Sequence, residues 1–177
     1  MNTADFIWMD GEFVAWEDAK VHVLSHSLHY GNAAIEGTKA YKTDKGYAIF
    51  KLREHTQRLL NSSKMTLMNV PFTLEELEAA QVELIKKNGF KGDSVYLRPL
   101  VYLGYGVMGL YHANAPVKVS ISAWEWGAYL GEEGLRNGIR LKISSFTRSS
   151  NKSTMGKAKA SANYLNSQMA KYEAVEC

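Results

Sequence analysis

Two lysines near the carboxyl end of the chain lie among small residues, in a segment (153–165) that reads STMGKAKASANYL. A lysine amine can form a Schiff base with an aldehyde cofactor, because its pKa falls readily when it is desolvated. Small neighbours let a large planar group approach the backbone of Lys157 or Lys159, and the hydroxyl of Tyr164 could tune that group by a hydrogen bond. The same residues could also form a solvated basic segment at the start of a helix.

A charged residue also interrupts an apolar run, because Arg98 lies within the sequence VYLRPLVYL of residues 95–103. A charge in such a strand must be paired or must face a cavity. Tyr96 is two residues away and therefore shares a strand face with Arg98. Arg98 is thus either half of a structural ion pair or a receptor for a carboxylate.

Arg58, by contrast, lies on a predicted helix among other charged residues, where a solvated surface arginine is the simpler interpretation.

Two further patterns indicate ordinary structure. Residues 104–109 read GYGVMG, but a dinucleotide site needs a helix to open there and an acidic residue about 20 positions later. Pro116 and another strand follow instead, which predicts a flexible loop. His26 and His29 are three residues apart, yet a zinc site needs three or four ligands and Cys177 is the one thiol. We therefore expect no metal site, and a hydrogen-bonded structural role for both histidines.

Composition excludes several classes of function. The net charge is +3 with no basic block, so nucleic acid is not an expected partner. One cysteine among 177 residues allows no internal disulfide and favours a reducing compartment. The first residues lack the pattern of a signal peptide, and no apolar run approaches the ~20 residues of a membrane span. These features predict a soluble, cytoplasmic protein without membrane contacts.

Hydrophobic periodicity and turn residues predict an α+β fold with an antiparallel sheet, in which hairpins are separated by helices. A glycine-rich stretch from Gly127 to Gly138 reads as a linker. Thr73 and Glu76 form a capping box, and Gly89 stops the helix that they begin. The expected elements are hairpins over 6–16 and 39–50; helices over 25–36, 53–67, 73–88 and 165–177; and strands over 94–103, 117–124 and 139–145.

Six segments, in the same order along the whole chain, resemble the branched-chain amino-acid aminotransferases, which are class IV, fold-type-IV pyridoxal-phosphate enzymes. The segment WGAYLG of residues 126–131 is the most specific to the branched-chain subgroup. The other five are DGE through WEDA (10–19), SHSLHYG through EG (25–37), REH through QRL (53–59), YLRPL (96–100) and KASANYL (159–165).

The resemblance implies a domain organisation. Residues 1–130 would form the small α/β domain, residues 131–138 the linker, and residues 139–177 the start of the large cofactor-binding domain. Family members continue for another domain's length and form dimers, so the activity is expected of a longer chain that assembles as a homodimer.

The resemblance also assigns roles residue by residue. Lys159 would hold pyridoxal 5'-phosphate and move the α-proton of the substrate, and Arg58 would grip the cofactor phosphate. Tyr164 would bond the cofactor's phenolic oxygen. Arg98 would meet the side-chain carboxylate of glutamate or 2-oxoglutarate. The positions that match the substrate pocket are Tyr30, Ile35, Gly37, Tyr96, Tyr129, Met108 and Leu110.

Two details qualify the pocket. Met108 and Leu110 lie on a loop that resembles one crossing the dimer interface to cover the neighbouring subunit's site. Ile35 stands where family members usually carry an aromatic residue, which changes the expected pocket wall.

The function implied is transfer of an amino group between leucine, isoleucine or valine and 2-oxoglutarate. D-amino-acid transaminase and aminodeoxychorismate lyase share the fold and the lysine, although WGAYLG and Arg98-Pro99 favour the branched-chain group. A different class of alternative is a cofactor-free fragment or a non-catalytic dimerising module.

Overall fold

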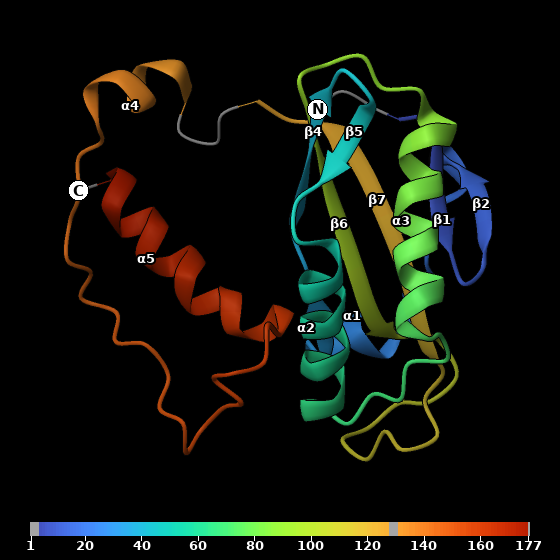
Figure 1. The fold of residues 1–177 in the computed structure, drawn as a ribbon. Helices are drawn as coiled ribbons and strands as arrows, with labels where there is room; N and C mark the ends of the chain where they lie inside the picture. The colour runs from blue at the N-terminus through green and yellow to red at the C-terminus, as the bar shows by residue number, and fades with distance from the viewer. Residues whose placement is uncertain (1–3, 128–130, 177) are drawn as a thin grey trace.

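One antiparallel sheet forms the centre of the computed structural model, which describes residues 4–127 and 131–176 (Figure 1). Its strands run in the order β2-β1-β7-β6-β4-β5, and β3 pairs with β6. The strands are β1 (Phe6–Met9), β2 (Glu12–Ala15), β3 (Ala33–Ile35), β4 (Thr38–Thr43), β5 (Gly46–Ile49), β6 (Ser94–Leu103) and β7 (Val117–Glu125).

Two long helices cover one face of this sheet, and the carboxyl-terminal elements lie to one side of it (Figure 1). The covering helices are α2 and α3, which pack against each other and against the sheet. The helices are η1 (Trp16–Asp18), α1 (His26–Tyr30), α2 (Leu52–Met65), α3 (Leu74–Asn88), α4 (Gly131–Asn137), η2 (Ser161–Asn163) and α5 (Tyr164–Glu176). The predicted α+β class with an antiparallel sheet is confirmed.

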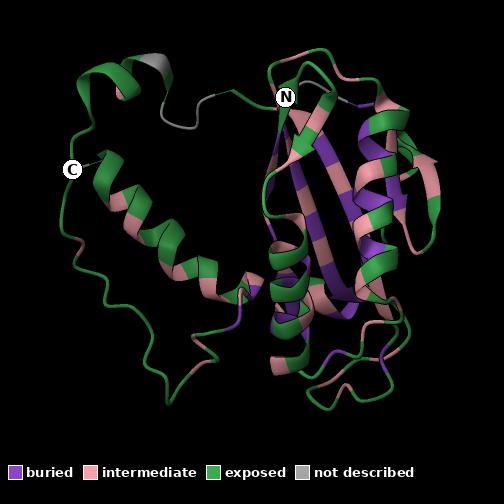
Figure 2. Ribbon diagram, in the orientation of Figure 1, coloured by how far each residue is buried: buried purple, intermediate pink, exposed green. Residues whose placement is uncertain are grey.

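The core lies between the sheet and the pair α2 and α3. Along β6, Val95 and Leu97 are fully buried, whereas Tyr96 and Arg98, which alternate with them, are only half-buried. This alternation gives β6 one face toward the helices and one face away from them, as Figure 2 shows. The second face is therefore the one on which polar side chains can meet a ligand.

Several predicted boundaries are confirmed by local geometry. Asp10 and Gly11 both have positive φ angles, 48° and 103°, which suits the tight turn between β1 and β2. Thr73 and Glu76 form the predicted capping box of α3, and Gly89 ends that helix with a φ of 57°. Helix α5 also occupies the predicted carboxyl-terminal stretch.

The helix expected over residues 25–36 is wrong in its second half. Helix α1 ends after Tyr30, because Gly31 adopts a φ of 74° and its N–H bonds the carbonyl of Ser27. Residues Ala33–Ile35 instead form β3, which pairs with the stretch of β6 from Leu100 to Tyr102. Small, buried alanines are compatible with either state, so the ladder bonds to β6 decide the outcome.

The strand expected over residues 139–145 is also wrong, since the structure has no strand there. Ile139, Leu141 and Ile143 alternate as a strand would, but they are 51%, 87% and 96% exposed. An alternating pattern becomes a strand only when another strand supplies backbone partners, and within the described residues none lies beside this segment. The proposed linker, residues 131–138, contains the short helix α4. The division of the chain into a small domain, a linker and the start of a large domain stays a prediction.

No described helix combines the length and the apolar character that crossing a lipid bilayer requires.

Candidate functional site

The backbone of Lys159 is fixed at the edge of the sheet by two separate elements. Its N–H donates to the Oγ of Ser62 on α2 at 3.0 Å, and its carbonyl accepts from the N–H of Ile35 on β3 at 3.0 Å. The next residue, Ala160, forms an isolated antiparallel bridge with Ala34. Lys159 is thus held as an added, strand-like residue next to β3, and this placement aims its side chain.

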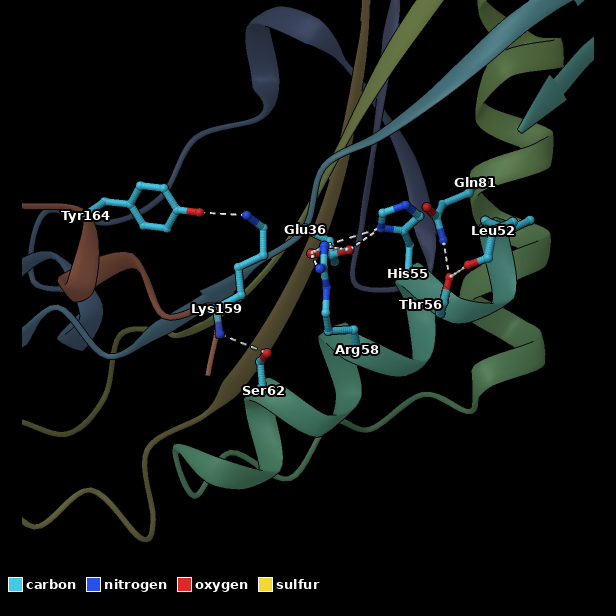
Figure 3. A network of polar contacts seen from close by, with 9 residues as sticks. All are labelled: Glu36, Leu52, His55, Thr56, Arg58, Ser62, Gln81, Lys159 and Tyr164. Carbon is cyan, nitrogen blue, oxygen red and sulfur yellow. Dashed lines mark hydrogen bonds and ion pairs between the residues drawn. The ribbon is translucent and has the colours of Figure 1, made fainter. Parts of the chain in front are cut away.

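The side chain of Lys159 meets Tyr164 at the start of α5. The Nζ atom donates to the Tyr164 hydroxyl at 2.6 Å (Figure 3). Lys159 is half-buried, whereas Lys157 two residues earlier is exposed. Of the two lysines considered from the sequence, it is therefore Lys159 whose amine meets Tyr164; the expected bond between Tyr164 and the cofactor stays a prediction.

One face of α2 carries three polar residues toward this region. His55, Arg58 and Ser62 are spaced by three and four positions, so they lie along the same side of the helix. Arg58 donates from Nε and Nη2 to the carboxylate of Glu36, at 3.1 Å and 2.7 Å to Oε1 and at 2.9 Å to Oε2. Figure 3 shows Glu36 between His55 and Arg58. Arg58 is thus not the solvated surface arginine that its charged neighbours suggested.

A buried polar contact fixes α2 against α3. Gln81 of α3 donates from Nε2 to the Thr56 hydroxyl at 2.9 Å and to the Leu77 carbonyl at 3.0 Å. The Thr56 hydroxyl in turn donates to the Leu52 carbonyl at 2.9 Å (Figure 3). Because the amide and the hydroxyl are both buried and bonded, rotation of α2 would leave them unsatisfied. This contact sets the direction in which the polar face of α2 points.

Two cavities meet at Lys159 and Tyr164, which line both. The first, which we call the basic cavity, has a volume of about 370 Å³. Its lining includes Arg58, Arg148, Ser149, Thr154, Lys157 and Asn163. The second, the aromatic cavity, has a volume of about 550 Å³. Its lining includes Ile35, Lys39, Tyr96, Arg98, Trp126 and Gly127.

Arg98 reaches the aromatic cavity with unused hydrogen-bonding capacity. Its Nη2 donates to the hydroxyl of Tyr96 at 2.9 Å, and its Nε is buried without a partner. Within the described residues Arg98 forms no ion pair, so the acidic structural partner considered from the sequence is not found there. A buried guanidinium N–H without an acceptor costs free energy, and a ligand oxygen that accepts its hydrogen bond would remove that cost.

Gly37 is required by the position of Tyr96. A Cβ atom built on Gly37 would lie 2.0 Å from the Tyr96 hydroxyl oxygen and 2.9 Å from the ring carbon that bears it. Any side chain at residue 37 would therefore displace the phenol. Tyr96 also packs against Trp124 and Trp126, with ring centroids at 5.1 Å and 4.9 Å.

Three predicted pocket residues lie together but away from both cavities. The Tyr30 hydroxyl accepts from the N–H of Gly109 at 3.2 Å, and Met108 and Leu110 flank that glycine, 46% and 85% exposed. His26 anchors the same loop by donating from Nε2 to the Gly109 carbonyl at 2.8 Å. The structure thus joins Tyr30, at the end of α1, to the loop over 104–116 that carries Met108 and Leu110, and does not bring these residues to Lys159 in the same chain.

The remaining expectations have simple outcomes. Residues 104–109 form no helix and belong to a loop, as predicted. His29, like His26, bonds a backbone carbonyl, that of Val23 at 3.0 Å. The described residues hold no group of three or more metal-ligating side chains. Tyr129, the last predicted pocket residue, lies outside the described residues.

Sequence reasoning did not single out Glu36, His55 and Ser62 as site residues. The signal that could have found them is the spacing 55, 58 and 62, which puts two polar residues on the helix face of Arg58. Glu36 carries a weaker signal, since it is an acidic residue between the apolar run of β3 and a glycine.

Comparison with known proteins places this geometry in a family. Residues 33–176 match the family described as amino-transferase class IV. The chain is 44% identical over 169 residues to the branched-chain-amino-acid aminotransferase of Pseudomonas aeruginosa, covering 96% of this chain and 54% of that protein. It is 44% identical over 172 residues to the Escherichia coli K12 enzyme of the same name, with coverages of 97% and 55%.

Solved structures agree. The T.th. branched-chain amino acid aminotransferase with pyridoxamine 5'-phosphate superposes with a TM-score of 0.90 at 48% identity, over 99% of this chain and 57% of that one. The same enzyme complexed with N-(5'-phosphopyridoxyl)-L-glutamate gives 0.87 at 47% identity, over 98% and 56%. The chain spans about half the length of these relatives. By sequence, and with the fold in agreement, the chain belongs to the class IV aminotransferases.

Proposed function

We propose that the protein transfers amino groups between the branched-chain amino acids leucine, isoleucine and valine and the acceptor 2-oxoglutarate, with pyridoxal 5'-phosphate as its cofactor. The observation that carries the proposal is the position of Lys159, whose amine bonds the Tyr164 hydroxyl where the basic cavity meets the aromatic cavity. An aldehyde cofactor bound there would have cationic groups at one end and a substrate space at the other.

The residues present fit such a cofactor. Arg58, Arg148 and Lys157 give the basic cavity three cationic side chains, and Ser149 and Thr154 add hydroxyl donors, a set that suits a phosphate. Lys159 supplies the amine that pyridoxal phosphate requires. The cofactor supplies an electrophilic carbonyl and an electron sink when bound. Solved relatives carry pyridoxamine phosphate and a phosphopyridoxyl-glutamate adduct, which supports the same cofactor here.

Lys159 and Tyr164 divide the work at the junction of the cavities. We assign to the Lys159 amine the removal and return of the proton at the substrate α-carbon, a step that needs a base within hydrogen-bond reach. The Tyr164 hydroxyl holds that amine at 2.6 Å and is placed to bond the cofactor's phenolic oxygen. The rigid backbone anchors of Lys159 keep the amine in one place through both half-reactions.

The aromatic cavity can serve two kinds of substrate. Ile35, Tyr96 and Trp126 give it apolar wall for a branched side chain. Arg98 offers its unpartnered Nε, next to the Tyr96 hydroxyl, to the side-chain carboxylate of glutamate or 2-oxoglutarate. An apolar wall with one cation at its edge is what an enzyme needs to accept both.

The proposal also covers assembly and location. Tyr30 of α1 bonds the exposed loop that carries Met108 and Leu110, which supports a homodimer in which this loop covers the partner subunit's site. We include Tyr129 in the substrate pocket by sequence match alone. A cytoplasmic location is part of the proposal because the sequence contains one cysteine, as proteins of reducing compartments commonly do.

D-amino-acid transaminase and aminodeoxychorismate lyase are less favoured, since the reported relatives are branched-chain enzymes. The test uses the full-length protein supplied with pyridoxal phosphate, with Lys159→Ala as the control. We expect cofactor absorbance in the visible range and amino transfer from leucine, isoleucine and valine to 2-oxoglutarate, both lost in the control. Turnover of D-alanine or of aminodeoxychorismate in place of these would refute the substrate assignment. A protein that takes up no cofactor would be the dimerising module considered from the sequence.

A further inference from the structure

The Glu36 carboxylate is a charged group that lies buried in the fold. Its side chain is 1% exposed, and it lies between strands β3 and β4 with its oxygens directed at α2. A buried carboxylate is strongly destabilising unless hydrogen bonds and an opposite charge compensate it. Arg58 supplies the charge through Nε and Nη2, and His55 donates from Nδ1 to the second carboxylate oxygen at 2.5 Å.

The tautomer of His55 follows from this contact. A carboxylate only accepts hydrogen bonds, so the Nδ1 atom of His55 must carry the hydrogen. The 3.4 Å approach of Arg58 Nη2 to the same nitrogen is then no hydrogen bond, because both groups are donors. The carboxylate is therefore held from two sides, by an arginine and by an imidazole that are one helical turn apart.

This arrangement leaves one end of Arg58 available. Nε and Nη2 are committed to Glu36, while Nη1 makes no hydrogen bond within the described residues. The Arg58 side chain is 54% exposed and lines the basic cavity. A half-exposed arginine on a helix would otherwise sample several rotamers, and ordering it would cost free energy each time a ligand binds. The pair Glu36 and His55 removes that freedom before binding.

We propose that Glu36 and His55 are positioning residues, which hold the guanidinium of Arg58 in the orientation that binds the cofactor phosphate. This inference rests on the proposed function, because the ligand of the basic cavity is the phosphate of pyridoxal 5'-phosphate. It adds a role for two residues that touch neither cofactor nor substrate. Glu36 also neutralises Arg58, so geometry rather than added positive charge is its contribution.

The position of Glu36 in the chain gives the pair a second consequence. Alternate residues of an extended chain face opposite sides. Ile35 lines the aromatic cavity and Gly37 contacts Tyr96, whereas Glu36 between them faces α2. The three residues therefore tie the phosphate side of the site to the substrate side through one short, rigid segment.

The first experiment compares two ligands that differ only in the phosphate. Full-length apoprotein, wild type and Glu36→Gln, is titrated with pyridoxal phosphate and with pyridoxal, and binding is followed by absorbance. The amide replaces the charge and presents N–H groups to donors. We expect pyridoxal phosphate to bind about 10-fold to 100-fold more weakly in the variant, the loss typical of a hydrogen bond to a charged group, with pyridoxal affinity unchanged. Equal losses for both ligands would mean that Glu36 is merely structural and would overturn the inference.

A double variant tests whether Glu36 acts through Arg58. If it does, Glu36→Gln combined with Arg58→Met should reduce the preference for pyridoxal phosphate over pyridoxal no further than Arg58→Met alone. Additive losses would overturn the inference. A wild type that binds neither ligand would instead overturn the proposed function, so the two failures are distinguishable.

A matched pair of variants at residue 55 keeps the test decisive if Glu36→Gln does not fold. The amide nitrogen of asparagine falls near the place of histidine Nδ1, whereas that of glutamine falls near Nε2. His55→Asn should therefore keep wild-type affinity for inorganic phosphate and for pyridoxal phosphate. His55→Gln should weaken both, with pyridoxal affinity unchanged. Identical behaviour of the two variants would overturn the role given to His55.

Discussion

Gly37→Ala offers a direct test of the carboxylate receptor in the aromatic cavity. The new Cβ would lie 2.0 Å from the Tyr96 hydroxyl oxygen, whereas ordinary contacts begin near 3.4 Å. The phenol must therefore move by more than the hydrogen bond to Arg98 Nη2, now 2.9 Å, can tolerate. The substitution thus separates Arg98 from the Tyr96 hydroxyl without altering either residue.

The size of the effect follows from that lost bond. A hydrogen bond to a charged group contributes about 1.5–3 kcal/mol, which corresponds to a roughly 10-fold to 150-fold decrease in kcat/KM. We expect this decrease for 2-oxoglutarate and glutamate, which use the carboxylate receptor, and a smaller one for leucine, which does not.

Steady-state kinetics with both substrate classes provide the assay. Gly127→Ala is the matched control, because Gly127 lines the same cavity and a Cβ there would meet no atom of the described residues within 4 Å. For 2-oxoglutarate, a Gly37→Ala, Tyr96→Phe double variant should lose little beyond Tyr96→Phe alone, because Tyr96→Phe already lacks the hydroxyl that bonds Arg98, even though the alanine Cβ would still lie 2.9 Å from the ring carbon. Unchanged kcat/KM for 2-oxoglutarate in Gly37→Ala would refute the reasoning.

Three other predictions concern single groups. Borohydride reduction of the cofactor-loaded protein, followed by peptide mapping, should label Lys159; a label on Lys157 would show that the assignment is wrong. Arg98→Met should reduce kcat/KM for glutamate and 2-oxoglutarate about 10-fold or more, and for leucine much less; equal losses would make Arg98 structural. The backbone N–H of Gly92, followed by that of its neighbour Lys91, lowers the pKa of Glu125 below its usual 4.5. Wild type should therefore exceed Glu125→Gln in free energy of unfolding at neutral pH, and the difference should vanish as the pH falls through the lowered pKa; a difference independent of pH in denaturant titrations would contradict this.

Local signals in the sequence were sufficient where one element decides its own structure. Thr73 and Gly89 bound α3 because capping is satisfied within a few residues. The alternation along β6 and the turn at Asp10 and Gly11 are equally local. The strand β3 was missed because its alanines suit a helix as well, and only pairing with β6, more than 60 residues away, makes it a strand.

The candidate site divides in the same way. Arg98 and the pair Lys157 and Lys159 could be singled out from their residue types and neighbours, whereas the choice of Lys159 and the role of Tyr164 came from the resemblance to the family. Glu36 and Ser62 carry only the weaker positional signals given above, because their roles come from contacts at sequence separations of 22 and 97 residues. A serine in the middle of a helix carries no sign that it will bond a distant backbone.

The bond between Lys159 and Ser62 also bears on the order of folding. Its ends are 97 residues apart, so it closes a long loop, and the entropy of that closure must be compensated by contacts that already exist. Ser62 itself is completely buried on a helix that packs against the sheet, and it is in place only when that core has formed. Long-range contacts of this kind form late and slow the overall rate. We therefore expect the Lys159 backbone to reach this position only after the core has formed, so that a partly folded chain would not hold its amine in the geometry proposed for cofactor capture.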